Sequence, residues 1–376
     1  MKRDPKVELM RIIACAIVVG THTYLPSVVS GQADIGRVFM SCVLADGVAV
    51  FWFINGFFLF KNKSYGSLLR HTLKNIIVPM VCVSLFYFYL GGWITDGETL
   101  AASVSHTPDE YKSLLNGVLS WNNAVPDTGY LWYLYVYVFI MLLYPVLKAF
   151  ADYLDGSAKR EKAFLIISAA ILLFNDISGN KFGSFSHHTV NALFPAAIEI
   201  LWGHIIYKYR DRFAKKRFMI ISIAAFLVFN VARTLVQMKN YSADTSDKSA
   251  LYWYTLFGLF CSLSVVVFCL ATGLQKERRT KTNIVICSVA SYTMTIYLVH
   301  IIVRNFLTHY GVLDMLQEII VGGRRGFLYE VAYDAAVIVI IFAISLVIAV
   351  LIRCLINLFK KIFSPAVKAV GKKAGE

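Results

Sequence analysis

Two ionisable residues in the first apolar stretch of the chain are its clearest candidates for chemistry. Arg11 and His22 lie in the segment 10–29, MRIIACAIVVGTHTYLPSVV, which is long enough to cross a bilayer. In a helix, their separation leaves an angular offset of only about 20° and an axial distance of about 16 Å. Ionisable residues in a spanning helix usually face a polar cavity, and an imidazole exchanges protons near neutral pH, so we expect a functional site on this face. The structural alternative is an arginine whose stem reaches the membrane surface and a histidine bonded by a neighbouring helix.

Two further polar residues fall inside later apolar stretches. Asn55 stands beside Gly56 in GVAVFWFINGFFLF, where a small residue allows a neighbouring helix to approach closely and an amide can bond across the contact. Glu199 lies in AAIEILWGHIIY; a carboxylate at membrane depth is either protonated or paired with a cation. His204, five residues after Glu199, is offset from it by about 140° and need not face the same cavity. Asn55 and Glu199 are candidate cavity residues, with interhelical packing or an arginine pair as the alternatives.

The segment SVASYTMTIYLVHIIVRNFLTHY carries three more polar side chains at helical spacing. Tyr297, His300 and Arg304 follow one another at intervals of three and four residues, which places them on one face of a helix. Such a stripe on an otherwise apolar helix is typical of a cavity wall, although a single histidine is more often structural. We add these three residues to the candidate substrate cavity.

A small basic group precedes the third apolar stretch. Arg70 and Lys74 are one helical turn apart in SLLRHTLKNIIVP. Basic side chains grouped in this way make charge-assisted bonds to phosphate, so they are candidates for a phosphate-bearing ligand. The charge distribution of a membrane protein explains them equally well.

The composition indicates a helical protein of the membrane. The chain has 376 residues, 58% of them hydrophobic and only 16% charged, and its mean hydropathy is +0.62. Apolar runs of spanning length predict an all-α, polytopic membrane protein with ten helices. The expected runs are 9–29, 39–60, 75–95, 130–150, 163–180, 190–207, 218–238, 251–274, 284–308 and 329–358.

Basic residues crowd every second connection between these runs, together with both chain ends. Most of the 37 lysines and arginines lie in these segments, so the positive-inside rule places both termini in the cytoplasm. The net charge of +14 is thereby explained without nucleic acid as a partner. One transmembrane domain occupies residues 1–376, with an outer loop over about 93–129, either a lid or a solvated loop. A basic tail over about 359–376 suits anionic membrane lipids.

Several soluble mechanisms have no support in the sequence. The seven cysteines show no CxxC pair and no disulfide spacing, and no metal site is indicated. There is no serine-hydrolase elbow, P-loop, dinucleotide fingerprint or HExxH motif. Any chemistry is therefore expected among the membrane helices.

The motifs, taken in order, resemble the acyltransferase family 3 of bacterial integral-membrane acyltransferases over almost the full chain. The most specific piece is ELMRIIACAIVVGTH, which carries the family's pattern of an arginine, ten residues and a histidine as Arg11 and His22. Looser matches are FWFINGFFLF at 51–60, the basic run ending at Pro79, LWYLYVYVFIMLLYP at 131–145 and SYTMTIYLVH at 291–300. Two features depart from the family: Asn55-Gly56 replaces a frequent Ser-Gly, and the paired arginines before the third helix appear only as Arg70 and Lys74.

The resemblance implies an O-acyltransferase of the bacterial cytoplasmic membrane. Such an enzyme moves an acyl group, commonly acetyl, from cytoplasmic acyl-CoA to a hydroxyl of a cell-envelope glycan or lipid-linked acceptor. His22 would act as general base on that hydroxyl, and Arg11 would bind donor phosphate or stabilise developing negative charge. Arg70 and Lys74 would join Arg11 in binding CoA. Direct transfer and a covalent acyl-histidine both remain open.

Two functions of other classes compete with this hypothesis. A transporter or exporter would move a small polar molecule through the same polar cavity, and discontinuous helices in repeat-related pairs would favour it. A structural subunit of an envelope polysaccharide system would leave the intramembrane arginine and histidine without a purpose. The sequence shows no such repeat, so acyl transfer is the preferred hypothesis.

Overall fold

Helices form nearly all of the described chain, as the apolar runs predict. The structure is a computed structural model, and it describes residues 3–29, 31–61, 64–119, 128–177, 188–243, 256–275, 280–324 and 326–373. The helices before residue 120 are α1 (Pro5–Thr21), α2 (Ile35–Val43), α3 (Gly47–Leu59), α4 (Tyr65–Thr72), the π-helix η1 (Leu73–Ile77), α5 (Val78–Thr95), α6 (Leu100–Ser103) and α7 (Pro108–Leu119). Strands β1 (Val28–Val29) and β2 (Gln32–Ala33) form one short antiparallel pair.

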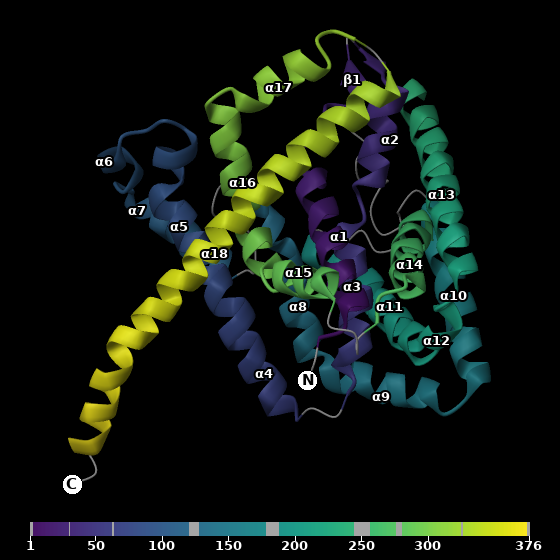
Figure 1. Ribbon diagram of the computed structural model, residues 1–376, viewed down its shortest axis with the longest axis horizontal. Helices are drawn as coiled ribbons and strands as arrows, with labels where there is room; N and C mark the ends of the chain where they lie inside the picture. The colour runs from purple at the N-terminus through teal and green to yellow at the C-terminus, as the bar shows by residue number, and fades with distance from the viewer. Residues whose placement is uncertain are drawn as a thin grey trace.

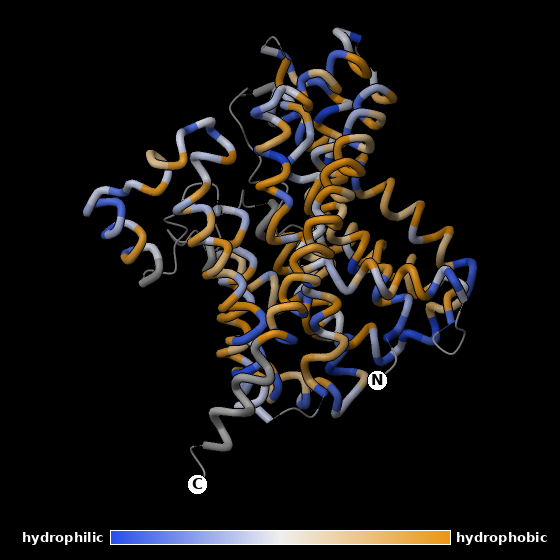
Figure 2. Tube along the Cα trace, turned by 60° about the vertical axis from the view of Figure 1, so that its left-hand side comes forward, coloured by the Kyte–Doolittle hydropathy of each residue, from blue (hydrophilic) through white to orange (hydrophobic). Residues whose placement is uncertain are grey.

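The second part of the chain continues the bundle. Its helices are the 3₁₀-helix η2 (Gly129–Leu131), α8 (Trp132–Leu142), α9 (Tyr144–Asp155), α10 (Ala158–Ile177), α11 (His188–Lys208), α12 (Arg210–Phe213), α13 (Lys216–Ala243), α14 (Leu256–Ala271), α15 (Lys281–Ala290), α16 (Thr293–His309), α17 (Val312–Ile320) and α18 (Phe327–Lys373). The first helix, α1, packs against α3, α14, α15, α16 and α18, so it lies at the centre of the bundle (Figure 1). Figure 2 shows apolar residues along the helices and hydrophilic residues mainly at helix ends and connections.

The structure confirms a helical protein with membrane-spanning helices, but it does not confirm ten spans. Among the described residues, four helices are long and apolar enough to cross a membrane: Ile35–Leu59, Tyr65–Thr95, Lys216–Lys239 and Phe327–Ile362. Two bent pairs bring the number to six if each pair is one span. Of the other expected runs, 9–29 is helical only to Thr21, and the described part of 251–274 forms the shorter apolar helix Leu256–Ala271.

The two bends have different local causes. The run expected over 130–150 turns by 69° between α8 and α9, where Pro145 occupies the first turn of α9. Proline lacks a backbone N–H and its ring clashes with the carbonyl four residues earlier, so the helix cannot continue straight through it. The run 284–308 turns by 60° between α15 and α16 at Ser291 and Tyr292. Arg353 of α18 donates hydrogen bonds to both the hydroxyl and the carbonyl oxygen of Ser291 at this bend.

One expected helix boundary is wrong, and two expected connecting or terminal segments contain helices. The first helix ends at Thr21 rather than near residue 29, because the chain turns there toward the β1–β2 hairpin. The basic tail expected over about 359–376 is helical as far as Lys373, where α18 ends, and residues 374–376 lie outside the described part. The outer loop over 93–129 holds α6 and α7 beside α5, away from α1 in Figure 1, while 120–127 lie outside the described residues.

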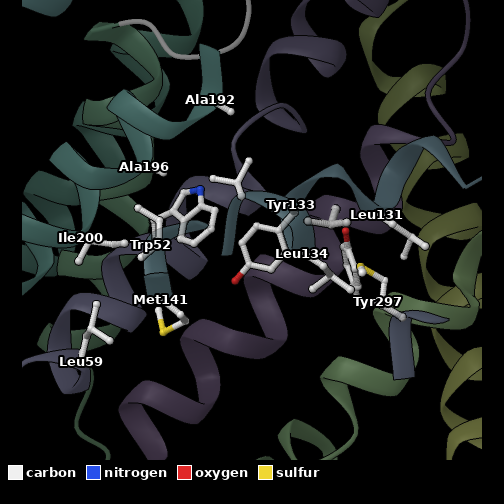
Figure 3. Close-up of a cluster of buried hydrophobic side chains, with 14 of the residues drawn as sticks. Trp52, Leu59, Leu131, Tyr133, Leu134, Met141, Ala192, Ala196, Ile200 and Tyr297 are labelled. Atoms are coloured by element: carbon white, nitrogen blue, oxygen red, sulfur yellow. The ribbon is translucent and has the colours of Figure 1, made fainter. Parts of the chain in front are cut away.

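The close approach expected at Gly56 is confirmed. A Cβ at Gly56 would overlap the carbonyl oxygen of Ile200 on α11, and a Cβ at Gly203 would overlap the carbonyl oxygen of Phe53 on α3. The two glycines therefore let α3 and α11 pack backbone to backbone, as small residues do in membrane helix pairs. The buried side chains beside this contact include Trp52, Leu59, Leu134, Met141 and Ile200 (Figure 3).

A larger residue at Gly56 is expected to destabilise the fold. Gly56→Val must push α3 and α11 apart or shift their backbones, and overpacking of this kind costs about 1–3 kcal/mol or more. We expect a lower thermal unfolding midpoint in detergent, measured by intrinsic fluorescence. Gly66→Val on α4 is the matched control, because no heavy atom lies within 4 Å of a Cβ built there. Equal midpoints for the two variants would refute the close α3–α11 contact.

Candidate functional site

Helix α1 positions both Arg11 and His22, and specific residues mark its two ends. The Asp4 side chain caps its first turn by accepting a hydrogen bond from the Lys6 backbone N–H at 3.0 Å, and Pro5 fits the first turn. His22 is the residue directly after the last helical residue, Thr21. The helix is unbroken between Arg11 and His22, so it fixes their separation along the bundle.

Each of the two residues lines a cavity of its own. The cavity beside His22, which we call the His22 cavity, has a volume of about 260 Å³. It combines aromatic rings with two carboxyl groups, one histidine and one threonine hydroxyl. The lining residues with these groups are Thr21, His22, Asp46, Trp52, Tyr130, Trp132, Glu199 and Tyr297.

The second cavity, which we call the Arg11 cavity, has a volume of about 250 Å³. Its polar lining residues are Arg3, Arg11, Asn55, Tyr133, Tyr137, Ser291, Thr293 and Tyr297. The two cavities share the elements α1, α3, α8 and α16, and Tyr297 lines both of them. They therefore lie next to each other inside the bundle, with His22 at one and Arg11 at the other.

A buried carboxylate holds the two arginines of the Arg11 cavity together. Glu8 is only 4% exposed, and its carboxylate lies 3.3 Å from an Nη1 of Arg11 and 3.8 Å from an Nη1 of Arg3. Two guanidinium groups against one carboxylate leave a net positive charge at this cavity, which favours an anionic ligand. The sequence reasoning missed Glu8 and Arg3, although Glu8 stands three residues before Arg11, at the spacing of helix neighbours.

His22 lies in a cluster of buried rings. Its ring centroid is 5.4 Å from that of His300 and 6.4 Å from that of Tyr130. His300 is fully buried, and its Nδ1 lies 2.6 Å from the carbonyl oxygen of Tyr297. Because a carbonyl oxygen only accepts, Nδ1 of His300 must carry a hydrogen. His300 therefore stands behind His22 as a support and does not itself line either cavity.

The carboxyl groups of the His22 cavity differ in their partners. Asp46 is paired with Arg233 of α13, whose Nη2 lies 2.8 Å from Oδ2 of Asp46. Arg233 also donates to the carbonyl oxygen of Cys42 at 2.9 Å and is 3% exposed, so this ion pair is buried. Glu199 is 5% exposed and has no ion pair among the described residues. The arginine partner considered for Glu199 thus belongs to Asp46, which sequence reasoning missed.

Other sequence candidates lie in different places. Asn55 lines the Arg11 cavity, where its Nδ2 is 3.4 Å from the hydroxyl of Tyr133. Arg304 is half-buried on α16, donates to Asn305 at 3.1 Å and lines neither cavity. His204 pairs with Asp155 at 3.0 Å, away from Glu199, as their angular offset predicted. Asn55, Glu199 and Tyr297 therefore join the cavities, and Arg304 and His204 do not.

The basic pair before α5 lies outside the Arg11 cavity. Arg70 of α4 and Lys74 of η1 are exposed, and neither lines the cavity. Ile76, two residues after Lys74, does line it. Lys74 therefore lies close in sequence to the wall of this cavity without being part of it. Its expected role in donor binding stays a prediction.

Comparison with known families identifies the family of the chain. A family model described as an acyltransferase domain, that of the acyltransferase 3 family, matches residues 4–356. The chain belongs to the acyltransferase 3 family. The match covers every element that lines the two cavities of this membrane acyltransferase. No curated protein and no solved structure matches the chain significantly.

Proposed function

We propose that this membrane acyltransferase moves an acetyl group from acetyl-CoA to a hydroxyl of a cell-envelope glycan or lipid-linked acceptor. The observation that carries the proposal is the pair of adjoining cavities, one basic at Arg11 and one holding His22. Two substrates can enter separate compartments and meet between them. A single polar passage would not need such different linings.

The Arg11 cavity fits the donor. Arg11 and Arg3 supply the net positive charge that CoA phosphates require, and charge-assisted bonds to phosphate are among the strongest in proteins. His22 lies about 16 Å farther along α1, so a long flexible arm must carry the thioester toward it. The pantetheine arm of CoA has this form.

The His22 cavity fits a hydroxylated acceptor such as a sugar. Trp52 and Trp132 offer flat apolar faces for the C–H face of a sugar ring. Asp46 and Glu199 offer oxygens for its hydroxyl groups. Aromatic faces and a few placed polar groups are the usual lining of a small-molecule site.

His22 can act as the general base in direct acyl transfer. The acceptor oxygen forms a bond to the thioester carbon as its proton passes to His22, and the C–S bond breaks. The proton then leaves His22 for the CoA thiolate, which departs through the Arg11 cavity. A covalent acyl-histidine would use the same residues in two steps. We place the protein in the bacterial cytoplasmic membrane with both termini and the Arg11 cavity toward the cytoplasm, where acyl-CoA is made.

Loss of Arg11 is expected to weaken donor binding. Arg11→Ala removes a charged hydrogen-bond donor, a contact of about 1.5–3 kcal/mol, so the Kd for acetyl-CoA should rise about 10- to 100-fold. Isothermal titration of the purified protein with acetyl-CoA measures this change. Lys74→Ala should have a smaller effect of the same sign, because Lys74 does not line the cavity.

A matched control distinguishes the loss of a contact in the Arg11 cavity from the loss of one positive charge anywhere on the protein. Arg217→Ala removes an exposed arginine at the start of α13, which lines neither cavity. Its affinity for acetyl-CoA should equal that of the unaltered protein. An Arg11→Ala protein that binds acetyl-CoA as well as the Arg217→Ala protein would exclude the Arg11 cavity as the donor site.

A further inference from the structure

A layer of four aromatic rings lies between the two cavities. The rings of Trp52 and Tyr133 are 4.5 Å apart between centroids, those of Tyr133 and Tyr297 are 5.8 Å apart, and those of Tyr297 and Tyr130 are also 5.8 Å apart. All four side chains are buried. Figure 3 shows Tyr133 between Trp52 and Tyr297.

The linings of the cavities place this layer at their boundary. Trp52 and Tyr130 line the His22 cavity, and Tyr133 lines the Arg11 cavity. Tyr297 lines both. The Tyr297 ring is therefore the part of the layer that a group passing from one cavity to the other must meet.

Hydrogen bonds hold Tyr297 in this position. Its hydroxyl donates to the carbonyl oxygen of Tyr130, and the Tyr130 hydroxyl donates to the carbonyl oxygen of Leu298 at 2.6 Å. His300 donates from Nδ1 to the carbonyl oxygen of Tyr297 itself. These two bonds join η2 to α16, and the Tyr297 ring cannot swing aside without breaking the bond from its hydroxyl to Tyr130.

We propose that Tyr297 sets the length of the acyl group that this acyltransferase accepts. The inference rests on the proposed function, in which the thioester comes from the Arg11 cavity and the hydroxyl from the His22 cavity. The thioester carbonyl must then reach the aromatic layer, and its acyl chain must fit among the rings. Packed rings leave room for an acetyl group but exclude a hexanoyl chain.

Shortening Tyr297 should admit the longer chain. Tyr297→Ala removes the phenol ring and leaves space that a hexanoyl group can enter, and a pocket discriminates by about 10- to 200-fold for each methylene it excludes. We expect the ratio of hexanoyl-CoA to acetyl-CoA turnover to rise at least about tenfold. Tyr297→Leu should give a smaller rise in the same direction. The measurement is release of the CoA thiol by purified protein, with water as the acceptor.

Further variants of Tyr297 separate a change in chain-length selectivity from loss of folding and from loss of acyl transfer. Tyr297→Phe retains the ring and loses only the hydrogen bond from its hydroxyl, so its turnover ratio should rise less than that of Tyr297→Leu. If Tyr297→Ala does not yield folded protein, Tyr297→Leu carries the test. An unaltered protein that releases no thiol from acetyl-CoA contradicts the proposed function. Two results would overturn the role of Tyr297 and leave the proposed function intact. One is thiol release with the same hexanoyl-to-acetyl ratio in the Leu and Ala variants as in the unaltered protein. The other is equal turnover of both donors by the unaltered protein.

Discussion

Replacing His22 by alanine is expected to lower acyl transfer about 10²- to 10⁴-fold, the usual contribution of a positioned general base. His22 lies at the end of α1 on the wall of the His22 cavity, and truncating it leaves the helix and its packing in place. Membrane insertion and the thermal unfolding midpoint should therefore change little. The measurement is the rate of release of CoA thiol from acetyl-CoA by purified protein at equal concentration.

Two other histidines give the comparison. His204→Ala removes a histidine that pairs with Asp155 outside both cavities, so its rate should equal that of the unaltered protein. His300→Ala should cost less activity than His22→Ala, because His300 supports the ring cluster from behind. Normal expression of His22→Ala with nearly full activity would exclude His22 as the base and favour transport.

Replacing Arg233 by methionine is expected to lower the free energy of unfolding by about 3–5 kcal/mol. The substitution leaves the Asp46 carboxylate buried without its partner, and an uncompensated buried charge is among the costliest single changes to a fold. Unfolding of the purified protein in mixed micelles with increasing SDS, followed by fluorescence, measures the loss.

The double variant tests the cause. Asp46→Asn combined with Arg233→Met removes both charges, so it should recover a large part of the lost stability, as double-mutant cycles of contacting groups do. Stability is the readout here, since Asp46 also lines the His22 cavity. A double variant no more stable than Arg233→Met would show that the ion pair is not the source of the effect.

Features that depend on spacing within one helix could be predicted from the sequence. The helical membrane class followed from the apolar runs, because backbone groups in a bilayer must bond internally. The Arg11 and His22 pair followed from helix geometry, and the structure places each of them on a cavity wall. The close approach at Gly56 followed from its missing side chain.

Features that depend on contacts between distant segments could not be predicted. Asp46 and Arg233 belong to different helices, and nothing in either local sequence names the other as its partner. The ten expected spans are not confirmed for a related reason, since continuous apolarity does not reveal the bend at Ser291 or the end of α1 at Thr21. Arg3 joined the Arg11 cavity although its position suggested only a topological charge.

The fate of the acyl group distinguishes acyl transfer from transport. Purified protein in liposomes is given acetyl-CoA labelled in the acetyl group, together with an envelope glycan fraction, and both the glycan and the free CoA thiol are measured. We predict label bound to the glycan as an alkali-labile ester, with an equal amount of thiol released, and about 10²- to 10⁴-fold slower formation of both products with His22→Ala. Passage of label across the membrane without thiol release, equal for the unaltered and His22→Ala proteins, would contradict acyl transfer and indicate a transporter.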